Sequence, residues 1–274
     1  MIIDGRKIAE DVLAEVKERV MALRQAQGEP LGLGAVLVGD DPEFKKFVDL
    51  KGKSAEKAGI TFTVYKFPEK IETEELKKRM QEIVGWSDGV LVELPLPKHI
   101  NQQAILNEVP VVKDVDVLSE EAQKFFYEGK FRVNPPAVEA LKIILEKHDI
   151  SVKGKKVAVF GQGILIGKPI SHWLEQQGAE VYRIRSKTEN PEKLSLQADI
   201  VIAGVGKPGL VGGEMIKNGA VVIDYGYGKK DGKMIGDVNF ESVAKKASLI
   251  TPVPGGMGPV LIAAVLKNLI KLNS

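Results

Sequence analysis

The sequence predicts an α/β protein of two lobes, each built on a parallel sheet. Over residues 33–94, short apolar runs alternate with amphipathic stretches in the order β-α-β-α-β, which is typical of a parallel sheet with helices on its faces. A second α/β stretch begins at Val157 with a strand, a glycine-rich turn and a helix. Between the two, residues 113–132 show no strong period, as expected of a segment that bridges two domains.

The first lobe opens with a helix and continues through the alternating elements. Apolar residues four apart between Ile8 and Val20 predict an amphipathic helix over residues 6–27. The strand at 33–38 leads to a helix in which Pro42 lies in the first turn and Asp41 is the cap. Gly59 ends that helix. The remaining expected elements are strands at 60–67 and 89–94 and helices at 73–84 and 103–109.

The second lobe is expected to begin where Asn134-Pro135-Pro136 caps a helix that runs to residue 147. Strand 157–160 then enters the glycine-rich turn and its helix. Further strands are expected at 180–185, 199–205 and 220–224. The chain is expected to cross back at 250–254, and an apolar final helix over 259–272 returns to the first lobe.

Composition excludes several classes of function. The chain has 274 residues, no cysteine and only three histidines, which are far apart, so we expect no disulfide, thiolate chemistry or metal site. The net charge of +2 gives no strong field for nucleic acid or an anionic membrane. No apolar run approaches the roughly 20 residues that span a bilayer, and the first residues do not read as a signal peptide. We therefore expect a cytoplasmic protein.

The glycine turn predicts a dinucleotide site. Gly161, Gly163 and Gly167 lie between a buried strand and a helix, where glycines let the backbone approach a pyrophosphate and the helix offers free N–H groups. The spacing is G-x-G-x-x-x-G rather than G-x-G-x-x-G. An ordinary tight turn between strand and helix is the alternative.

The residues at the end of the next strand indicate which dinucleotide the site would bind. An NAD site has an acidic residue at the end of this strand for the ribose 2′-hydroxyl, whereas a 2′-phosphate requires cations and hydroxyls. The residues here are Arg185, Ser186 and Lys187. This favours NADP, with a solvated basic turn as the alternative.

Three more stretches could carry chemistry. Phe44, Phe47 and Lys51 share one helix face, so Lys51 is either a partly desolvated proton shuttle or a lysine whose head reaches water. Glu93 lies at the carboxyl end of a strand, and the KDVD segment adds Asp116. The loop TPVPGGMGP at 251–259 predicts a close backbone approach to a ligand or another segment, with a plain hinge as the alternative.

These pieces resemble the methylenetetrahydrofolate dehydrogenase/cyclohydrolase family over nearly the whole chain. The segments that carry the resemblance are IIDGRKIA, VGDDP, FVDLKGKSAEKAGI, VELPLPKHIN, KDVD, GQGILIGKP, ADIVIAGVGKP, AVVIDYGYG, GDV and TPVPGGMGP. LPLPKHIN and TPVPGGMGP are specific enough that chance is a poor explanation.

The resemblance implies a folate-binding catalytic domain at 1–118, completed by a C-terminal helix at 257–274, and a Rossmann-type NAD(P) domain at 119–256, with a cleft between the lobes. It implies oxidation of 5,10-methylenetetrahydrofolate with NADP, or possibly NAD, and hydrolysis of the methenyl product to 10-formyltetrahydrofolate. This chemistry belongs to one-carbon metabolism and purine biosynthesis. The family is usually a homodimer.

The resemblance also assigns residues. The expected catalytic residues are Lys51, Glu93 and Asp116. Other expected substrate contacts are Phe47, Val92, Leu94, Pro254, Gly255, Gly256, Met257 and Gly258. The expected coenzyme contacts are Gly161, Gln162, Gly163, Arg185, Ser186, Lys187 and Tyr227. No metal is implied.

The sequence departs from the family at several of these positions. Glu93 stands where the family has glutamine, and a carboxylate beside Lys51 favours the ammonium form. Gln162 replaces an arginine, which removes one cation for the 2′-phosphate. The other departures are Phe44 for Ser, Phe47 for Tyr, Val117 for Gly and Gly163 for Ser. A dehydrogenase with weak or absent cyclohydrolase activity, and a non-catalytic paralogue that binds folate or nucleotide, are therefore the alternatives.

Overall fold

The computed structural model describes residues 1–230 and 232–274. Their contacts divide them into two units. Unit 1 contains Met1–Ala9 and Ala137–Leu261, and unit 2 contains Glu10–Pro136 and Ile262–Ser274. The boundaries cut α1 (Gly5–Gln27) and α10 (Met257–Leu272), so these two helices contribute to both units.

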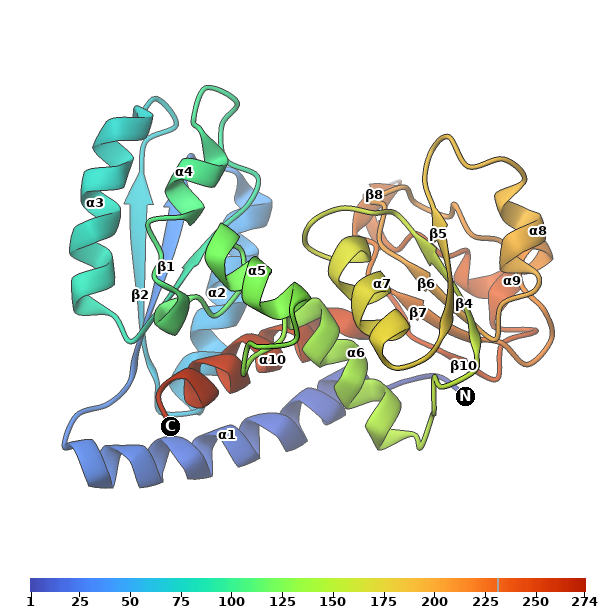
Figure 1. Cartoon of the computed structure of the whole chain (residues 1–274), viewed down its shortest axis with the longest axis horizontal. Coiled ribbons are helices and arrows are strands. Elements are labelled where there is room, and N and C mark those ends of the chain that lie inside the picture. Colours follow the sequence, from blue (N-terminus) through green and yellow to red (C-terminus); the bar gives the residue numbers. More distant parts are fainter. Residues whose placement is uncertain (231) are drawn as a thin grey trace. The chain divides into compact units, whose positions relative to one another are not determined.

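Unit 2 is built on a three-stranded parallel sheet in the order β2-β1-β3. The strands are β1 (Gly32–Val38), β2 (Thr61–Phe67) and β3 (Gly89–Val92). The helices between and after them are α2 (Pro42–Lys57), α3 (Thr73–Trp86) and α4 (Gln102–Leu106). Figure 1 shows α2 and α3 on opposite sides of this sheet. The predicted β-α-β-α-β order and parallel pairing are confirmed.

Alternate strand residues build the core between this sheet and α3. Val36 and Val90 point to the same face, because side chains alternate along a strand, and they pack with Leu76 and Met80 of α3. β3 ends at Val92 rather than at the expected residue 94, since the LPLP sequence that follows cannot continue a ladder. The sheet therefore stops just before Glu93.

Residues 113–132 contain a helix that the sequence analysis did not predict. α5 (Glu120–Tyr127) follows the short 3-10 turn η1 (Val111–Lys113). Ser119 caps α5 by accepting a hydrogen bond from the Ala122 N–H, and Phe126 packs inward. Eight residues give too few repeats for a clear period, but the Ser119 cap was the available signal.

Unit 1 is built on a five-stranded parallel sheet in the order β10-β7-β6-β4-β5. The strands are β4 (Lys156–Phe160), β5 (Glu180–Ile184), β6 (Ile200–Ala203), β7 (Val221–Asp224) and β10 (Leu249–Ile250). Counted from β4, this is the doubly wound order 2-1-3-4-5. The chain switches direction between β4 and β6, and ligands of such sheets bind at the carboxyl ends of the strands at that point.

Helices cover both faces of the unit 1 sheet. α7 (Gly167–Gln176) lies on one side, and α8 (Pro191–Ser195) and α9 (Phe240–Val243) lie on the other (Figure 1). The core on the α8 and α9 side includes Phe160, Val201, Val222 and Val243. α6 (Pro136–Lys147) has the predicted bounds.

Some short elements of unit 1 were not predicted. They are α8, α9, the strand β10, the 3-10 turn η2 (Gly213–Met215) and the antiparallel pair β8 (Gly228–Lys230) and β9 (Lys233–Ile235). Each has two to five residues, which is below the length at which periodicity is informative. None of the helices in the described part of the chain has both the length and the apolar character to cross a lipid bilayer.

Candidate active site

The carboxyl end of the unit 2 sheet carries a charged cluster. In the order β2-β1-β3 the switch point lies between β1 and β3. Glu93 follows β3 directly, and its backbone N–H donates to the Val36 carbonyl at 2.9 Å. This bond fixes the backbone of Glu93 at the ligand-binding edge of the sheet.

Lys51 reaches this edge from α2. Its Nζ donates to Glu93 Oε1 at 2.5 Å, and the two side chains are only 17% and 10% exposed. The contact joins an ammonium and a carboxylate, so it is a charge-assisted hydrogen bond, a class shorter and stronger than neutral hydrogen bonds. The interpretation of Lys51 as a lysine whose head reaches bulk water is therefore wrong.

Asp116 is placed beside the pair by an added strand pairing. Asp114 pairs in parallel with Val90 of β3, so Asp116, two residues further on, lies level with the end of that strand. Burial raises the pKa of Asp116 to about 7; the Lys51 ammonium opposes the shift and the Glu93 carboxylate adds to it. Asp116 is therefore partly protonated at neutral pH, and it can donate as well as accept a hydrogen bond.

The turn after Asp116 is held by Asp114. The buried Asp114 carboxylate accepts hydrogen bonds from the Leu118 and Ser119 N–H groups at 3.0 and 2.8 Å. Burial raises the pKa of Asp114 above its ordinary value, and these hydrogen bonds oppose the rise without cancelling it. Val117 has φ of 58°, which explains why glycine suits this position. Its side chain is 1% exposed, and burying a valine gains roughly 1.5–3 kcal/mol, which offsets roughly 1–2 kcal/mol for the left-handed backbone.

Apolar residues lie next to the charged residues along the chain. Phe44 and Phe47 lie seven and four residues before Lys51 on the same helix face and are half-buried. Val92 is buried and Leu94 is half-buried on either side of Glu93 in the sequence, and both pack into the core beneath α3.

The glycine turn of unit 1 joins three elements. Gly161, with φ of +89°, follows β4, and a Cβ there would lie 2.6 Å from the Gly204 carbonyl oxygen after β6. A Cβ on Gly167 would lie 1.9 Å from the Gly161 carbonyl oxygen. These two glycines therefore allow the close packing, whereas a Cβ on Gly163 would meet no atom within 4 Å. The turn is open at Gly163.

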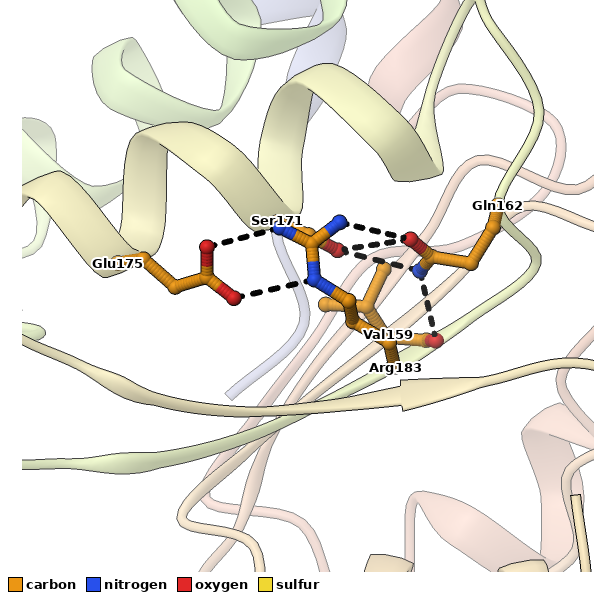
Figure 2. Close-up of polar contacts among 5 residues, drawn as sticks. All are labelled: Val159, Gln162, Ser171, Glu175 and Arg183. Carbon is orange, nitrogen blue, oxygen red and sulfur yellow. Dashed lines mark hydrogen bonds and ion pairs between the residues drawn. The ribbon is translucent and has the colours of Figure 1, made fainter.

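Gln162 does not project from this turn. Its Nε2 donates to the Gly161 carbonyl at 2.8 Å and to Ser171 Oγ of α7 at 3.1 Å. Figure 2 shows the amide folded toward Ser171 and Arg183. The other residues predicted for the coenzyme site lie after the carboxyl ends of strands. Arg185, Ser186 and Lys187 are exposed after β5, and Tyr227 is half-buried between β7 and β8.

The proline- and glycine-rich loop belongs to unit 1 and packs against the chain's own N-terminal segment. A Cβ on Gly5 would lie 1.8 Å from the Gly256 carbonyl oxygen, and Gly255 has φ of +100°. The Ile3 N–H donates to Ile250 just before the loop. Gly256 thus makes the close backbone approach predicted for this loop, with Gly5 as its partner, whereas a Cβ on Gly258 would meet no atom within 4 Å.

Two buried carboxylates of unit 1 were missed by the sequence analysis. Asp224, at the end of β7, accepts hydrogen bonds from the N–H groups of Gly226, Asp237 and Val238. Burial raises its pKa to about 6. Asp237 in turn accepts from the Val205 and Gly206 N–H groups. The signal was an acidic residue at a strand end in AVVIDYGYG and GDV.

Among the described residues, no group of three or more His, Asp or Glu side chains could hold a metal ion. The chemistry on view is that of a lysine–carboxylate pair and of a nucleotide-type turn. Fold and geometry define a class: an α/β protein of two units, one with the sheet order of nucleotide-binding proteins and one with a lysine–carboxylate cluster at its ligand-binding edge.

Comparison with known proteins gives the family. The model of the tetrahydrofolate dehydrogenase/cyclohydrolase catalytic domain matches residues 3–116, and the model of its NAD(P)-binding domain matches residues 135–274. The chain belongs to the tetrahydrofolate dehydrogenase/cyclohydrolase family. It is 42% identical to the bifunctional protein FolD of Mycoplasmopsis synoviae, with 99% of each chain covered. It is also 42% identical to FolD of Moorella thermoacetica, with 98% and 97% covered.

Solved structures agree. The bifunctional FolD from Campylobacter jejuni has a TM-score of 0.96 at 33% identity and covers 100% of this chain and 98% of its own. The FolD from Trypanosoma brucei, solved with NADP cofactor and an inhibitor, has a TM-score of 0.94 at 32% identity and covers 100% and 97%. The predicted family and two-lobed α/β fold are confirmed.

Proposed function

We propose that this protein oxidises 5,10-methylenetetrahydrofolate with NADP and hydrolyses the resulting 5,10-methenyltetrahydrofolate to 10-formyltetrahydrofolate. The observation that carries the proposal is the half-buried Lys51–Glu93 pair at 2.5 Å, beside Asp116, in the part of the chain that matches the family's catalytic domain. A dehydrogenase without hydrolysis and a binding-only paralogue are not favoured, because full-length relatives are bifunctional enzymes by name.

The residues of unit 1 fit NADP. The open backbone at Gly163 leaves room for a pyrophosphate in front of α7. Two cations and a hydroxyl, from Arg185, Lys187 and Ser186, lie just beyond β5, where a ribose 2′-phosphate is expected. When bound, NADP supplies the nicotinamide that accepts the hydride. We assign Gly161, Gln162 and Tyr227 as further coenzyme contacts.

The hydrolysis needs a group that moves one proton. Water adds to the methenyl carbon and loses one proton. As the carbon–nitrogen bond then breaks, a proton reaches the leaving nitrogen, and the remaining hydroxyl proton leaves to solvent as the formyl C=O forms. We assign the transfer of the proton that water loses first to Lys51, which accepts it as the amine and returns it to the leaving nitrogen as the ammonium. Glu93 Oε1 accepts a hydrogen bond from Lys51 Nζ at 2.5 Å, which fixes the position of this nitrogen.

The substrate contacts follow from the same cluster. Asp116 binds the pterin ring, since a carboxyl with a pKa near 7 can pair with ring N–H groups or donate to a ring nitrogen. Phe47 stacks on the aminobenzoyl group, with Val92 and Leu94 as apolar contacts. We assign the remaining folate contacts to Pro254, Gly255, Gly256, Met257 and Gly258.

The wider assignments rest on the family resemblance. We propose a folate-binding domain of residues 1–118 and 257–274, an NAD(P)-binding domain of residues 119–256, a homodimer, and a cytoplasmic location with a role in purine biosynthesis. Size-exclusion chromatography with light scattering tests the dimer: a monomer mass at micromolar concentration would refute it.

One assay tests the reaction. Purified protein is mixed with methylenetetrahydrofolate and either NADP or NAD, and the absorbances of reduced nicotinamide and of the methenyl product are followed separately. We expect reduced nicotinamide to accumulate with NADP while the methenyl absorbance falls behind it because of hydrolysis. If neither nicotinamide supports turnover, the enzymatic proposal is wrong.

A further inference from the structure

Arg183 is a charged residue inside a strand, and its side chain is held in place by helix α7. It lies in β5 opposite Val159 of β4. Arg183 Nε donates to Glu175 Oε1 at 3.0 Å, and Nη2 donates to Glu175 Oε2 at 2.8 Å. This two-point contact fixes the plane of the guanidinium as well as its position.

A third contact ties Arg183 to the glycine turn. Its Nη1 donates to Gln162 Oε1 at 3.3 Å. Gln162 is itself held by the Gly161 carbonyl and by Ser171 Oγ. Figure 2 shows the guanidinium between Glu175 on one side and Gln162 on the other. The arginine side chain is 33% exposed, so it is ordered and still accessible.

The guanidinium keeps capacity for a ligand. It has five N–H groups, and the bonds to Glu175 and Gln162 use three of them. Within the described part of the chain, one N–H on Nη1 and one on Nη2 therefore donate to no protein atom. A guanidinium binds phosphate through such paired N–H groups.

We propose that Arg183 is a specificity-determining residue for the coenzyme and supplies the cation that Gln162 does not. It binds the 2′-phosphate that distinguishes NADP from NAD, and Glu175 is a positioning residue that also tempers its charge. The inference rests on the proposed function, because it assumes a nicotinamide dinucleotide at the glycine turn. Arg185 and Lys187 are exposed, with more rotamer freedom to lose on binding, whereas Arg183 is already fixed.

The test compares two ligands that differ at the ribose. Adenosine 2′,5′-bisphosphate and 5′-AMP are titrated calorimetrically into wild-type protein and Arg183→Gln. We expect the variant to bind the bisphosphate about tenfold or more weakly, and 5′-AMP unchanged within about twofold. Lys193→Gln removes the same charge from α8, on the other face of the sheet, and should change neither affinity. Glu175→Gln keeps a hydrogen-bond acceptor for the guanidinium but removes the opposing charge, so it should strengthen bisphosphate binding several-fold and leave 5′-AMP binding unchanged.

Three outcomes would overturn the proposal: equal weakening of both ligands by Arg183→Gln, which means a structural clamp; no change with either ligand; or no bisphosphate binding by the wild type. If Arg183→Gln does not fold, Arg183→Lys and Glu175→Gln test the proposal instead. The lysine keeps the positive charge but not the paired N–H groups of the guanidinium, so it should lose part of the preference for the bisphosphate. The titrations contain no folate. Retained discrimination without dehydrogenase turnover would therefore support the Arg183 assignment and refute the proposed reaction.

Discussion

Glu93 changes what Lys51 can do. The family resemblance gives a glutamine here, which can hydrogen-bond the lysine without a charge, whereas the observed contact is an ion pair at 2.5 Å. The pair is mostly buried, so the attraction is screened less than in water. Two substitutions separate the roles of the two residues.

Lys51→Met should abolish hydration of methenyltetrahydrofolate. The expected loss is about 100-fold or more, which is the usual contribution of a positioned proton-transfer group. The dehydrogenase step needs little acid–base help and should retain measurable turnover. Lys53→Met, on an exposed part of the same helix, is the matched control. Decay of methenyl absorbance measures hydration, and an unchanged rate in Lys51→Met would remove this lysine from the mechanism.

Glu93→Gln should raise the cyclohydrolase rate. The glutamine amide keeps a hydrogen-bond acceptor for Lys51 Nζ but replaces the ion pair at 2.5 Å, so Nζ is held less firmly and can turn to the water more readily. The same absorbance decay, measured across a range of pH, reports the change. A fall in rate would mean that Glu93 itself transfers the proton.

Carboxylates at the ends of strands and in short loops hold backbone segments that the strands themselves do not pair with. Glu93 follows the last residue of β3, and Asp224 is the last residue of β7. Asp224 binds three backbone N–H groups, and Asp237, which binds two more, lies close enough to raise the pKa of Asp224. The loops after β6 and β7 are therefore fixed by buried carboxylates.

This arrangement predicts a pH dependence of stability. The pKa of Asp224 is raised from 3.8 to about 6 in the folded protein, so its protonated form favours folding. That stabilisation is complete below the unfolded pKa and is lost as pH rises through about 6. Between about pH 5 and about pH 8 the loss amounts to about 1 kcal/mol.

Asp224→Asn should remove this part of the slope. Urea unfolding of unit 1 is followed by the fluorescence of Trp173 in a Trp86→Phe background, since these are the two tryptophans and Trp86 belongs to unit 2. Asp149→Asn, at an exposed position of the same unit, is the control. An undiminished slope in Asp224→Asn would contradict the assignment of the titration to this carboxyl.

The two candidate sites of the chain lie in different units. The lysine–carboxylate cluster lies in unit 2, and the glycine turn with its basic residues lies in unit 1. A ligand stabilises the unit that binds it by mass action, by about 2.7 kcal/mol at 100 times its Kd. Selective ligands should therefore report which unit holds which site.

NADP should stabilise unit 1. In Trp86→Phe, where Trp173 reports, we expect saturating NADP to shift the urea midpoint upward. In Trp173→Phe, where Trp86 of α3 reports, a folate analogue should produce the larger shift. A shift by NADP confined to the Trp86 signal would place the coenzyme in the wrong unit and refute the domain assignment.

Local pattern was enough to predict much of this molecule. The order of strands and helices follows from periodicity, which each segment carries in its own residues. The edge at which Glu93 lies follows too, because the carboxyl ends of parallel strands meet at one side of a sheet. The motifs GQGILIGKP and TPVPGGMGP also led to the correct family.

Contacts between distant residues could be seen only in the folded chain. Lys51 and Glu93 are 42 positions apart, and Gln162 and Arg183 are 21 apart; no periodicity links either pair. The helix pattern alone favoured Lys51 as a lysine whose head reaches water, and the family resemblance showed Gln162 only as a lost cation. Tertiary packing determined the partners of both Lys51 and Gln162, because a buried polar group is hydrogen-bonded in nearly all folded proteins. Which partner lies within reach depends on how the sheets and helices pack.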